Sequence, residues 1–153
     1  MIAFFKFVWT IILSWILHRK QKYGYRSYFK GHIIPVMKRV DAMYGRNYRL
    51  LSIAALHDTI EDTGVSEDWL VKHGVDPYVA KMVSILSKQK DVNYNDYIAN
   101  IAAYEDAFHV KYADMLCNYS SSILSMDARR INKYKKGLHH MCVCRTNIIG
   151  RYK

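Results

Sequence analysis

The sequence is short of residues that interrupt helices: its 153 residues include two prolines, Pro35 and Pro77, and seven glycines. Glycine and proline are the least favourable residues in a helix interior, so their scarcity predicts a mainly helical chain. The length suits one domain of ordinary size and not two. Apolar residues make up 51% and charged residues 24%. This ordinary composition excludes a disordered chain, a collagen-like repeat and a polytopic membrane protein.

Cysteine is also scarce, and its three residues make a poor disulfide framework because Cys142 and Cys144 are separated by a single residue. This pattern indicates a reducing compartment, so we expect a cytoplasmic protein. The segment His139–Cys144 gathers soft metal ligands, but its Cys-x-Cys spacing differs from that of common zinc sites. We expect residues 137–153 to form a basic C-terminal tail after a domain spanning residues 1–136.

Acidic residues are absent from both ends of the chain. Residues 1–40 and residues 129–153 each carry eight Lys or Arg and no acid, whereas residues 41–128 carry all 13 acids and seven bases. Basic ends beside an acidic middle suit a phosphate-rich ligand bound next to a carboxylate-held metal. A soluble protein with solvated surface charges is the alternative. The basic run at 129–136 lacks any recognised nucleic-acid motif, so we expect a solvated helix and no nucleic-acid partner.

Residues 2–17 are strongly apolar but fall short of the roughly 20 residues that a membrane-spanning helix needs. The polar residues Lys6, Thr10, Ser14 and His18 recur every four positions, and on a helix they form one stripe. We expect a first helix with a wide buried apolar face. The alternative is attachment to a membrane surface, because Trp9, Trp15 and the cations that follow are typical of an interfacial helix.

Capping and turn residues divide the rest of the chain into helices, with no repeat or linker between them. The pattern predicts an all-α fold in a single domain. The expected helices are residues 34–44, 48–62, 67–73, 77–88, 93 or 95 to 104, 105–119 and 121–136, the last with Ile123, Leu124, Met126 and Ile131 on its apolar side.

The motif that carries chemistry is His57-Asp58-Thr59-Ile60-Glu61-Asp62, which follows an apolar helical run. On a continuous helix, His57 stacks above Glu61 and Asp58 above Asp62. Burying an imidazole together with three carboxylates is costly unless a cation compensates their charge. A divalent metal is therefore expected, since imidazole and carboxylate ligands suit Mn, Fe, Zn or Mg. A solvated helix end with capping acids is the alternative, although the helix dipole disfavours acids at a C-terminus.

This motif resembles the core of HD-type phosphohydrolases, and above all the hydrolase domain of the RelA/SpoT family, which degrades guanosine tetra- and pentaphosphate alarmones. Other segments agree in order and approximate spacing over residues 10–120. They are the His-x-x-Gln of His18 to Gln21, the single His32, Ser84 to Lys88, Tyr94 to Ile98, and Lys111-Tyr112-Ala113-Asp114 followed by Asn118. The resemblance implies the HD-domain helical bundle of the small stand-alone members.

The resemblance also implies roles for individual residues. His32, His57, Asp58 and Asp114 would hold one divalent ion, Mn²⁺ in this branch. Glu61 and Asp62 would orient and deprotonate the attacking water. The implied substrate-binding residues, which contact phosphate, sugar or base, are Arg19, Lys22, Tyr23, Arg26, Lys88 and Asn118.

The implied activity is hydrolysis of a small phosphorylated nucleotide, with removal of the 3′-pyrophosphate from guanosine tetra- or pentaphosphate first among the options. Tyr23 stands where the family has an arginine, and Met115 and Cys117 replace the common Arg and His of the late motif. Two alternatives stay open. One is a phosphomonoesterase acting on a deoxynucleoside monophosphate or on NADPH, and the other is a non-enzymatic basic binding module. The sequence leaves the oligomeric state open.

Overall fold

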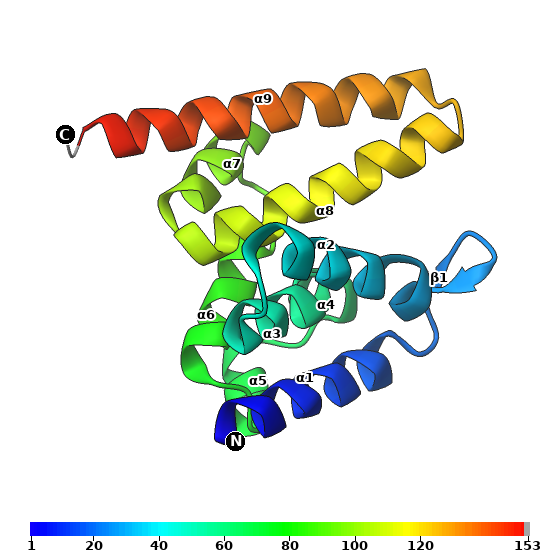
Figure 1. Cartoon of the computed structure of the whole chain (residues 1–153), viewed down its shortest axis with the longest axis vertical. Coiled ribbons are helices and arrows are strands. Elements are labelled where there is room, and N and C mark those ends of the chain that lie inside the picture. The colour runs from blue at the N-terminus through cyan, green and yellow to red at the C-terminus, as the bar shows by residue number, and fades with distance from the viewer. Residues whose placement is uncertain (152–153) are drawn as a thin grey trace.

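The structure is a computed structural model that describes residues 1–151. Within that range the chain is almost entirely helical, as predicted, and adds one two-stranded hairpin (Figure 1). The elements up to the middle of the chain are α1 (Ile2–His18), β1 (Lys22–Tyr23), β2 (Arg26–Ser27), a π-helical turn η1 (Phe29–Ile33), α2 (Ile34–Tyr44), α3 (Tyr48–Leu56) and α4 (Thr59–Thr63). The remaining elements are α5 (Glu67–Lys72), α6 (Pro77–Leu86), α7 (Tyr94–Ala103), α8 (Glu105–Leu124) and α9 (Ala128–Gly150).

Helix α3 is the centre of the core. Every residue from Leu50 to Leu56 is buried, and the helix packs against α1, α2, α6 and α8. Its start is fixed by Asn47, whose side-chain oxygen accepts hydrogen bonds from the backbone N–H groups of Arg49 and Leu50, a standard N-cap. Because α3 is buried all round, the residues directly after it emerge inside the protein and not at its surface.

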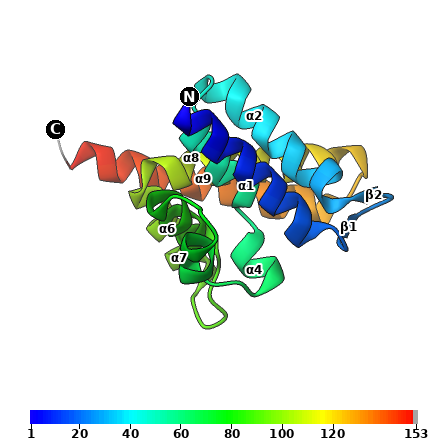
Figure 2. The same ribbon diagram turned by 90° about the horizontal axis from the view of Figure 1, so that it is seen from below.

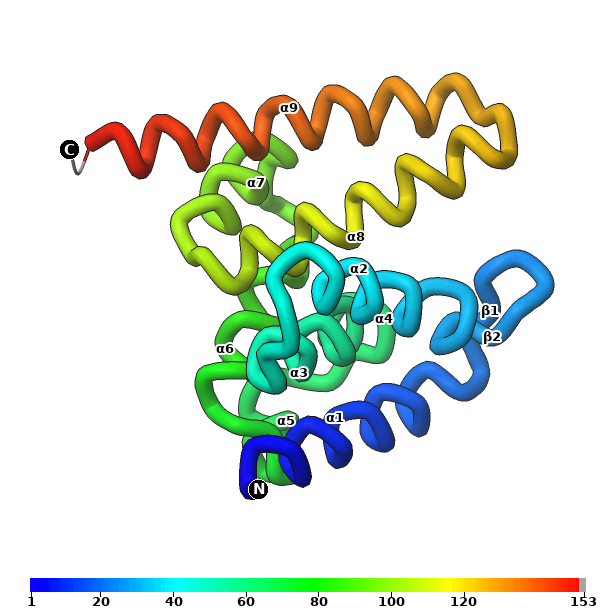
Figure 3. The backbone as a smooth tube through the Cα atoms, in the orientation of Figure 1, coloured from blue at the N-terminus to red at the C-terminus, as the bar shows by residue number. Residues whose placement is uncertain are grey.

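The helices stack in layers from α1 at one edge to α9 at the other (Figures 1 and 3). Helix α8 runs alongside α9, and α7 packs against the same side of α9. Gly137 of α9 lies at this contact. A Cβ at that position would collide with Cε of Met115 and lie 2.9 Å from the Tyr94 hydroxyl.

The C-terminal third differs from the prediction. Helix α8 continues through Ser120 and Ser122 to Leu124, because both serine hydroxyls donate to the carbonyl four residues earlier and so fit the helix. The chain turns at Met126, which has a φ of 52°. The expected apolar side of a 121–136 helix is wrong, since Ile123, Leu124 and Met126 are exposed.

Residues 137–150, expected as part of a basic tail, form the second half of α9. Gly137 and Met141 are buried on this stretch, and Arg145 donates to the carbonyl of Ala102. These contacts join the segment to the rest of the domain. Residues 152 and 153 lie outside the described range.

Helix α1 buries a narrower apolar face than the wide one expected. Its polar stripe points inward: Thr10, Ser14 and His18 are buried, and Ser14 Oγ donates to the carbonyl of Ala55. Leu13 is buried beside them, and Phe7 and Leu17 pack against the core. Phe5, Ile12 and Trp15 lie on the outer face instead and are exposed. The stripe therefore anchors α1 to α3 and α4. Among residues 1–151, no helix combines the length and hydropathy that crossing a membrane requires.

Candidate metal centre

The residues predicted as metal ligands come together at the junction of three segments. His32 belongs to the π-helical turn η1, His57 and Asp58 form the turn between α3 and α4, and Asp114 lies on the buried side of α8. The predicted continuous helix over 48–62 is wrong at this point, since α3 ends at Leu56 and α4 begins at Thr59. The break lets both His57 and Asp58 face His32.

The donor atoms of these side chains converge. His32 Nε2 lies 3.2 Å from His57 Nε2, 3.3 Å from Asp58 Oδ2 and 3.2 Å from Asp114 Oδ1. His57 Nε2 lies 2.9 Å from Asp58 Oδ2 and 3.9 Å from Asp114 Oδ1. The other ring nitrogen of His57, Nδ1, is 2.9 Å from the carbonyl of Ala54. Because a carbonyl oxygen only accepts hydrogen bonds, Nδ1 carries a proton there, and the contact directs Nε2 toward the cluster.

This geometry fits a divalent cation. Ligand atoms bound about 2.1 Å from one ion, at angles between tetrahedral and octahedral, are separated by about 3.0–3.4 Å. Nitrogen and carboxylate oxygen form a mixed donor set that suits Mn, Fe or Zn. His32, His57 and Asp58 place one ligand atom each within 4.8 Å of one another, and Asp114 adds a further oxygen beside both imidazoles.

The electrostatics of the cluster favour positive charge at its centre. Burial lowers the pKa of His32, but the carboxylates of Asp114 and Asp58 outweigh burial and raise it to about 10. Burial raises the pKa of Asp58, yet the His57 and His32 side chains bring it well below its usual range. Both carboxylates are thus held ionised inside the protein. A cation at this point compensates charge that the fold has already buried.

Lys111 and Asn118 hold Asp114 in place from one turn before and one turn after it on α8. Lys111 Nζ lies 3.0 Å from Asp114 Oδ2, and Asn118 Nδ2 donates to Asp114 Oδ1 over 2.6 Å. Burial raises the pKa of Asp114, but Lys111 and His32 bring it down to about 2. Burial lowers the pKa of Lys111, but the Asp114 carboxylate raises it well above its usual value. The carboxylate is therefore ionised and oriented before any metal binds.

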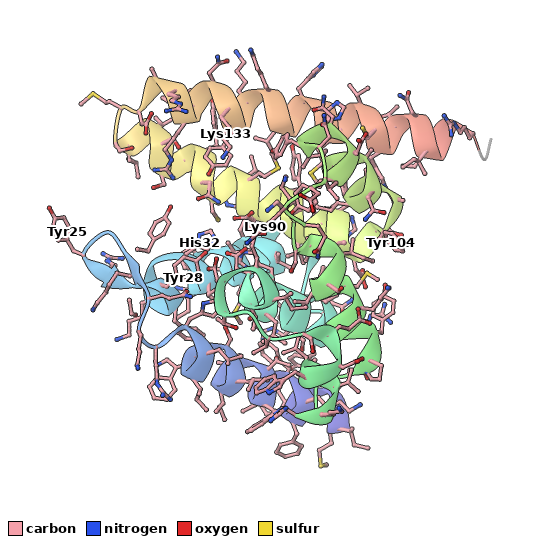
Figure 4. All side chains as sticks on the ribbon, turned by 180° about the vertical axis from the view of Figure 1, so that it is seen from behind. Tyr25, Tyr28, His32, Lys90, Tyr104 and Lys133 are labelled. Atoms are coloured by element: carbon pink, nitrogen blue, oxygen red, sulfur yellow. The ribbon has the colours of Figure 1, made fainter. Side chains whose placement is uncertain are left out.

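Two tyrosines enclose the histidine side of the centre. The Tyr23 ring stacks on His32 with ring centres 5.3 Å apart, and Gly31 permits this because a side chain there would press on Tyr23. The Tyr28 hydroxyl donates to Asp58 Oδ2. Burial and the Asp58 carboxylate raise the Tyr28 pKa, so the phenol stays a donor. Figure 4 shows Tyr28 and His32 near one another, while Tyr25 points away from the tip of the hairpin.

The predicted His-x-x-Gln segment positions α4 and does not contact the cluster through a hydrogen bond. His18 bridges Gln21 Oε1 and Thr59 Oγ1 at 2.6 and 3.3 Å, and Gln21 Nε2 donates to the carbonyl of Asp62. Since Thr59 and Asp62 belong to α4, these contacts fix the short helix that carries Glu61. Burial and the nearby Asp58 carboxylate raise the pKa of Asp62.

A cleft of about 470 Å³ lies over the centre, lined by charged and aromatic side chains. Its lysines come from three separate parts of the chain and its tyrosines from four, so the cleft offers both cations and flat rings to a ligand. The lining residues are Tyr23, Tyr28, His32, Asp58, Glu61, Asp62, Lys88, Tyr94, Tyr97, Lys111, Asp114, Met115, Asn118, Lys133 and Tyr134.

Most of the predicted site residues reach this cleft. Besides the predicted ligands His32, Asp58 and Asp114, these are Glu61, Asp62, Tyr23, Lys88 and Asn118; His57, buried at the cluster, completes the ligand set. Glu61 Oε2 accepts a hydrogen bond from the backbone N–H of Lys88, which ties the loop after α6 to α4. Arg19, Lys22 and Arg26 do not line the cleft; all three are exposed, and Arg26 lines a neighbouring hollow with Arg130. Their part in phosphate binding stays a prediction.

Several lining residues had no predicted role in the site, including Lys111, Lys133 and Tyr134. Lys111 carries a detectable signal, since it stands one helical turn before Asp114 in an otherwise apolar face. Lys133 and Tyr134 lie in the basic run of α9, where nothing in the local pattern separates a cleft residue from a solvated one. Figure 4 shows Lys133 beside α8 and α9 on the side of the molecule that carries His32.

Comparison with known proteins places the fold. No protein-family model and no curated protein matches the sequence. Among solved structures, the chain is similar to a metazoan orthologue of SpoT that hydrolyses ppGpp, with a TM-score of 0.76 and 22% sequence identity, over 92% of this chain and 85% of that one. This likeness confirms the expected HD-domain helical fold. At 22% identity, it shows similarity of fold alone.

Proposed function

We propose that this protein is a metal-dependent phosphohydrolase of a small nucleotide, and that its reaction is removal of the 3′-pyrophosphate from guanosine tetra- or pentaphosphate. The observation that carries the proposal is the convergence of His32, His57, Asp58 and Asp114 at the base of a cleft lined by lysines and tyrosines. The fold supports it, because the similar metazoan protein hydrolyses ppGpp.

In this proposal those residues hold one Mn²⁺ ion. A bound divalent ion supplies Lewis acidity to a phosphate oxygen and to the water that attacks phosphorus. The protein contributes orientation: Lys111 and Asn118 fix the Asp114 carboxylate, Tyr28 fixes Asp58, and the Ala54 carbonyl fixes the His57 tautomer. Such supporting contacts set ligand geometry and affinity in metal sites generally.

Glu61 and Asp62 are the proposed proton acceptors for the attacking water, since both line the cleft on α4 next to Asp58. The raised pKa of Asp62 makes it a better proton acceptor than an ordinary aspartate. The water oxygen bonds to phosphorus, the bond from phosphorus to the sugar 3′-oxygen breaks, and that oxygen leaves with a proton. The products are pyrophosphate and guanosine 5′-diphosphate from the tetraphosphate, or guanosine 5′-triphosphate from the pentaphosphate.

The lysines of the cleft are proposed to compensate the negative charge of the substrate. Lys88 and Lys133 enter it from the loop after α6 and from α9, and they are proposed to bind the phosphates electrostatically. The rings of Tyr23 and Tyr134 are proposed to contact the base. Tyr23 also donates to Asn118 Oδ1, which leaves the Asn118 amide directed at Asp114 and its surroundings.

The test is product analysis on the purified full chain with Mn²⁺, using guanosine tetraphosphate, deoxynucleoside monophosphates and NADPH, with a chelator control. The proposal expects pyrophosphate from guanosine tetraphosphate and no release when metal is chelated. If no product is released from any nucleotide of the panel while Mn²⁺ is bound, nucleotide hydrolysis is rejected. The basic-module alternative instead predicts metal-independent binding that weakens steeply with salt.

A phosphomonoesterase is the second candidate, and one observation favours it. Arg19, Lys22 and Arg26 do not line the cleft, and an aromatic ring, Tyr23, occupies the wall beside His32. Fewer cations beside the base and sugar suit a substrate with a single phosphate. Orthophosphate release from a monophosphate in the same assay, without pyrophosphate from the tetraphosphate, selects this candidate.

A further inference from the structure

The outer face of α1 is apolar and uncovered. Phe5, Ile12 and Trp15 are 63%, 42% and 55% exposed, and their spacing places them on one side of the helix. Phe4 and Trp9 flank this side and are also partly exposed. Viewed from below, α1 lies in front of the other helices with nothing drawn across it (Figure 2). The inward side of the same helix carries Thr10, Leu13, Ser14 and His18, all buried.

A group of exposed cations continues from the end of this face. Arg19, Lys20 and Lys22 directly follow α1, and all three are exposed. Residues 1–40 contain no acid. The other cation of α1, Lys6, is paired with Asp76 at 3.1 Å. An apolar aromatic surface therefore ends in a positive patch that no acid of the same segment neutralises.

We propose that this face of α1 binds the surface of an anionic lipid bilayer, with the helix axis in the plane of the membrane. Aromatic and aliphatic side chains enter the interface between headgroups and acyl chains, and the cations after the helix bind acidic headgroups. Tryptophan suits the interface between headgroups and acyl chains, because its ring is apolar and its N–H is polar. Trp9 already satisfies its N–H on the carbonyl of His73.

The charge of the segment distinguishes a bilayer from a second copy of the chain. Two copies joined through this face would bring together apolar surface but no acid from residues 1–40 to pair with the exposed cations. An anionic bilayer satisfies both the apolar and the cationic part. Helix α9, which carries Lys133, lies at the opposite edge of the molecule (Figure 1), so this orientation leaves α9 in water.

The test is flotation of the full chain with phosphatidylcholine vesicles, with and without phosphatidylglycerol. The informative variant is Ile12→Glu combined with Trp15→Glu, which changes exposed side chains only. The matched control is Ile123→Glu, because Ile123 is also apolar and 48% exposed but lies on α8. Circular dichroism checks that each variant keeps its helices, and sedimentation equilibrium measures the oligomeric state.

The proposal expects binding to the phosphatidylglycerol vesicles, weaker binding to phosphatidylcholine alone, and a loss of about tenfold or more in the double variant. The control should bind as the unchanged protein does. Absence of binding, or equal binding by the double variant, overturns the proposal. A dimer that the double variant converts to monomer, without vesicle binding, overturns it in favour of a second copy. No step of this test depends on catalytic activity.

Discussion

Lys111 and Asp114 form a buried ion pair inside the candidate metal centre, with Nζ 3.0 Å from Oδ2. The other oxygen of the same carboxylate, Oδ1, faces His32 at 3.2 Å. One carboxylate thus divides its two oxygens between a permanent cation of the protein and the proposed metal. The lysine offsets part of the buried negative charge whether or not a metal is bound, which makes the stability of the chain and its metal affinity interdependent.

Lys111→Met is expected to destabilise the metal-free protein by about 3 kcal/mol or more, because it leaves the Asp114 carboxylate buried without its partner. Mn²⁺ should restore more stability to this variant than to the unchanged chain, since the ion then supplies the missing charge. Thermal unfolding with and without Mn²⁺ measures both effects. Lys90→Met is the control, because Lys90 is exposed. An equal Mn²⁺ shift in both variants would show that Asp114 does not bind the metal.

Asp58→Asn removes a carboxylate oxygen that lies 2.9 Å from His57 and 3.3 Å from His32. We expect Mn²⁺ affinity to fall by about 100-fold or more, beyond the effect of losing a supporting residue, and turnover to disappear. Calorimetric titration of Mn²⁺ measures the affinity. Asp91→Asn serves as the matched exposed control. Tight Mn²⁺ binding by the Asp58 variant would place the metal elsewhere.

Glu61→Gln separates proton transfer from structure. The Gln side-chain oxygen can still accept from the backbone N–H of Lys88, as Glu61 does over 3.1 Å, so the loop after α6 keeps its anchor. Only the capacity to take a proton is lost. We expect unchanged Mn²⁺ affinity and a turnover number lower by about 10²-fold or more. Full activity in this variant would assign the proton acceptor to Asp62 or to bulk water.

The residues of the candidate metal centre could be predicted together because His57-Asp58 and Asp114 sit in distinctive motifs and His32 follows where the resemblance expects it. The start of α3 could be predicted because Asn47 is a local cap. What the sequence could not show depends on long-range packing. The outward apolar face of α1 was missed because Ser14 and His18 are needed inside, where they bind Ala55 and Thr59 across 41 positions of sequence. Lys133 was assigned to solvent because only the packing of α9 over the cleft distinguishes it from its neighbours.

The end of α8 was misjudged for a different reason. The prediction ended this helix at residue 119, before a run of serines, which disfavour a helix interior when they compete for the backbone. In the structure, Ser120 and Ser122 turn the same hydroxyl groups back onto carbonyls of their own helix. The helix therefore continues to Leu124, and the chain turns where Met126 adopts a positive φ. The residue types at this position do not predict that conformation.

His18 predicts a pH dependence of stability. Burial lowers its pKa below the ordinary value of 6.5, so between the two values the unfolded chain binds more protons than the folded one. The stabilisation by His18 is therefore present above the unfolded pKa and is lost as pH falls below it. The free energy difference between the unchanged chain and His18→Gln should shrink from pH 8 to pH 5.5. Because this difference subtracts one stability from the other, the contributions of groups present in both proteins, including His32, cancel.

A matched variant checks this assignment. His109 also has a pKa lowered by burial and stacks on Tyr44 with ring centres 4.0 Å apart, but it is only half-buried. His109→Gln should show the same sign of pH dependence with a smaller amplitude. A stability difference for His18→Gln that stays constant across this pH range would mean that the folded state does not disfavour its protonation.

The most direct test of the account is a titration of the metal-free chain with Mn²⁺ in which bound metal and cleavage of guanosine tetraphosphate are measured in the same samples. We expect one tightly bound ion per chain, pyrophosphate release that rises in proportion to bound metal, and loss of both in Asp58→Asn. Turnover that is independent of bound Mn²⁺, or one bound ion per chain without any cleavage of the nucleotide, would contradict it.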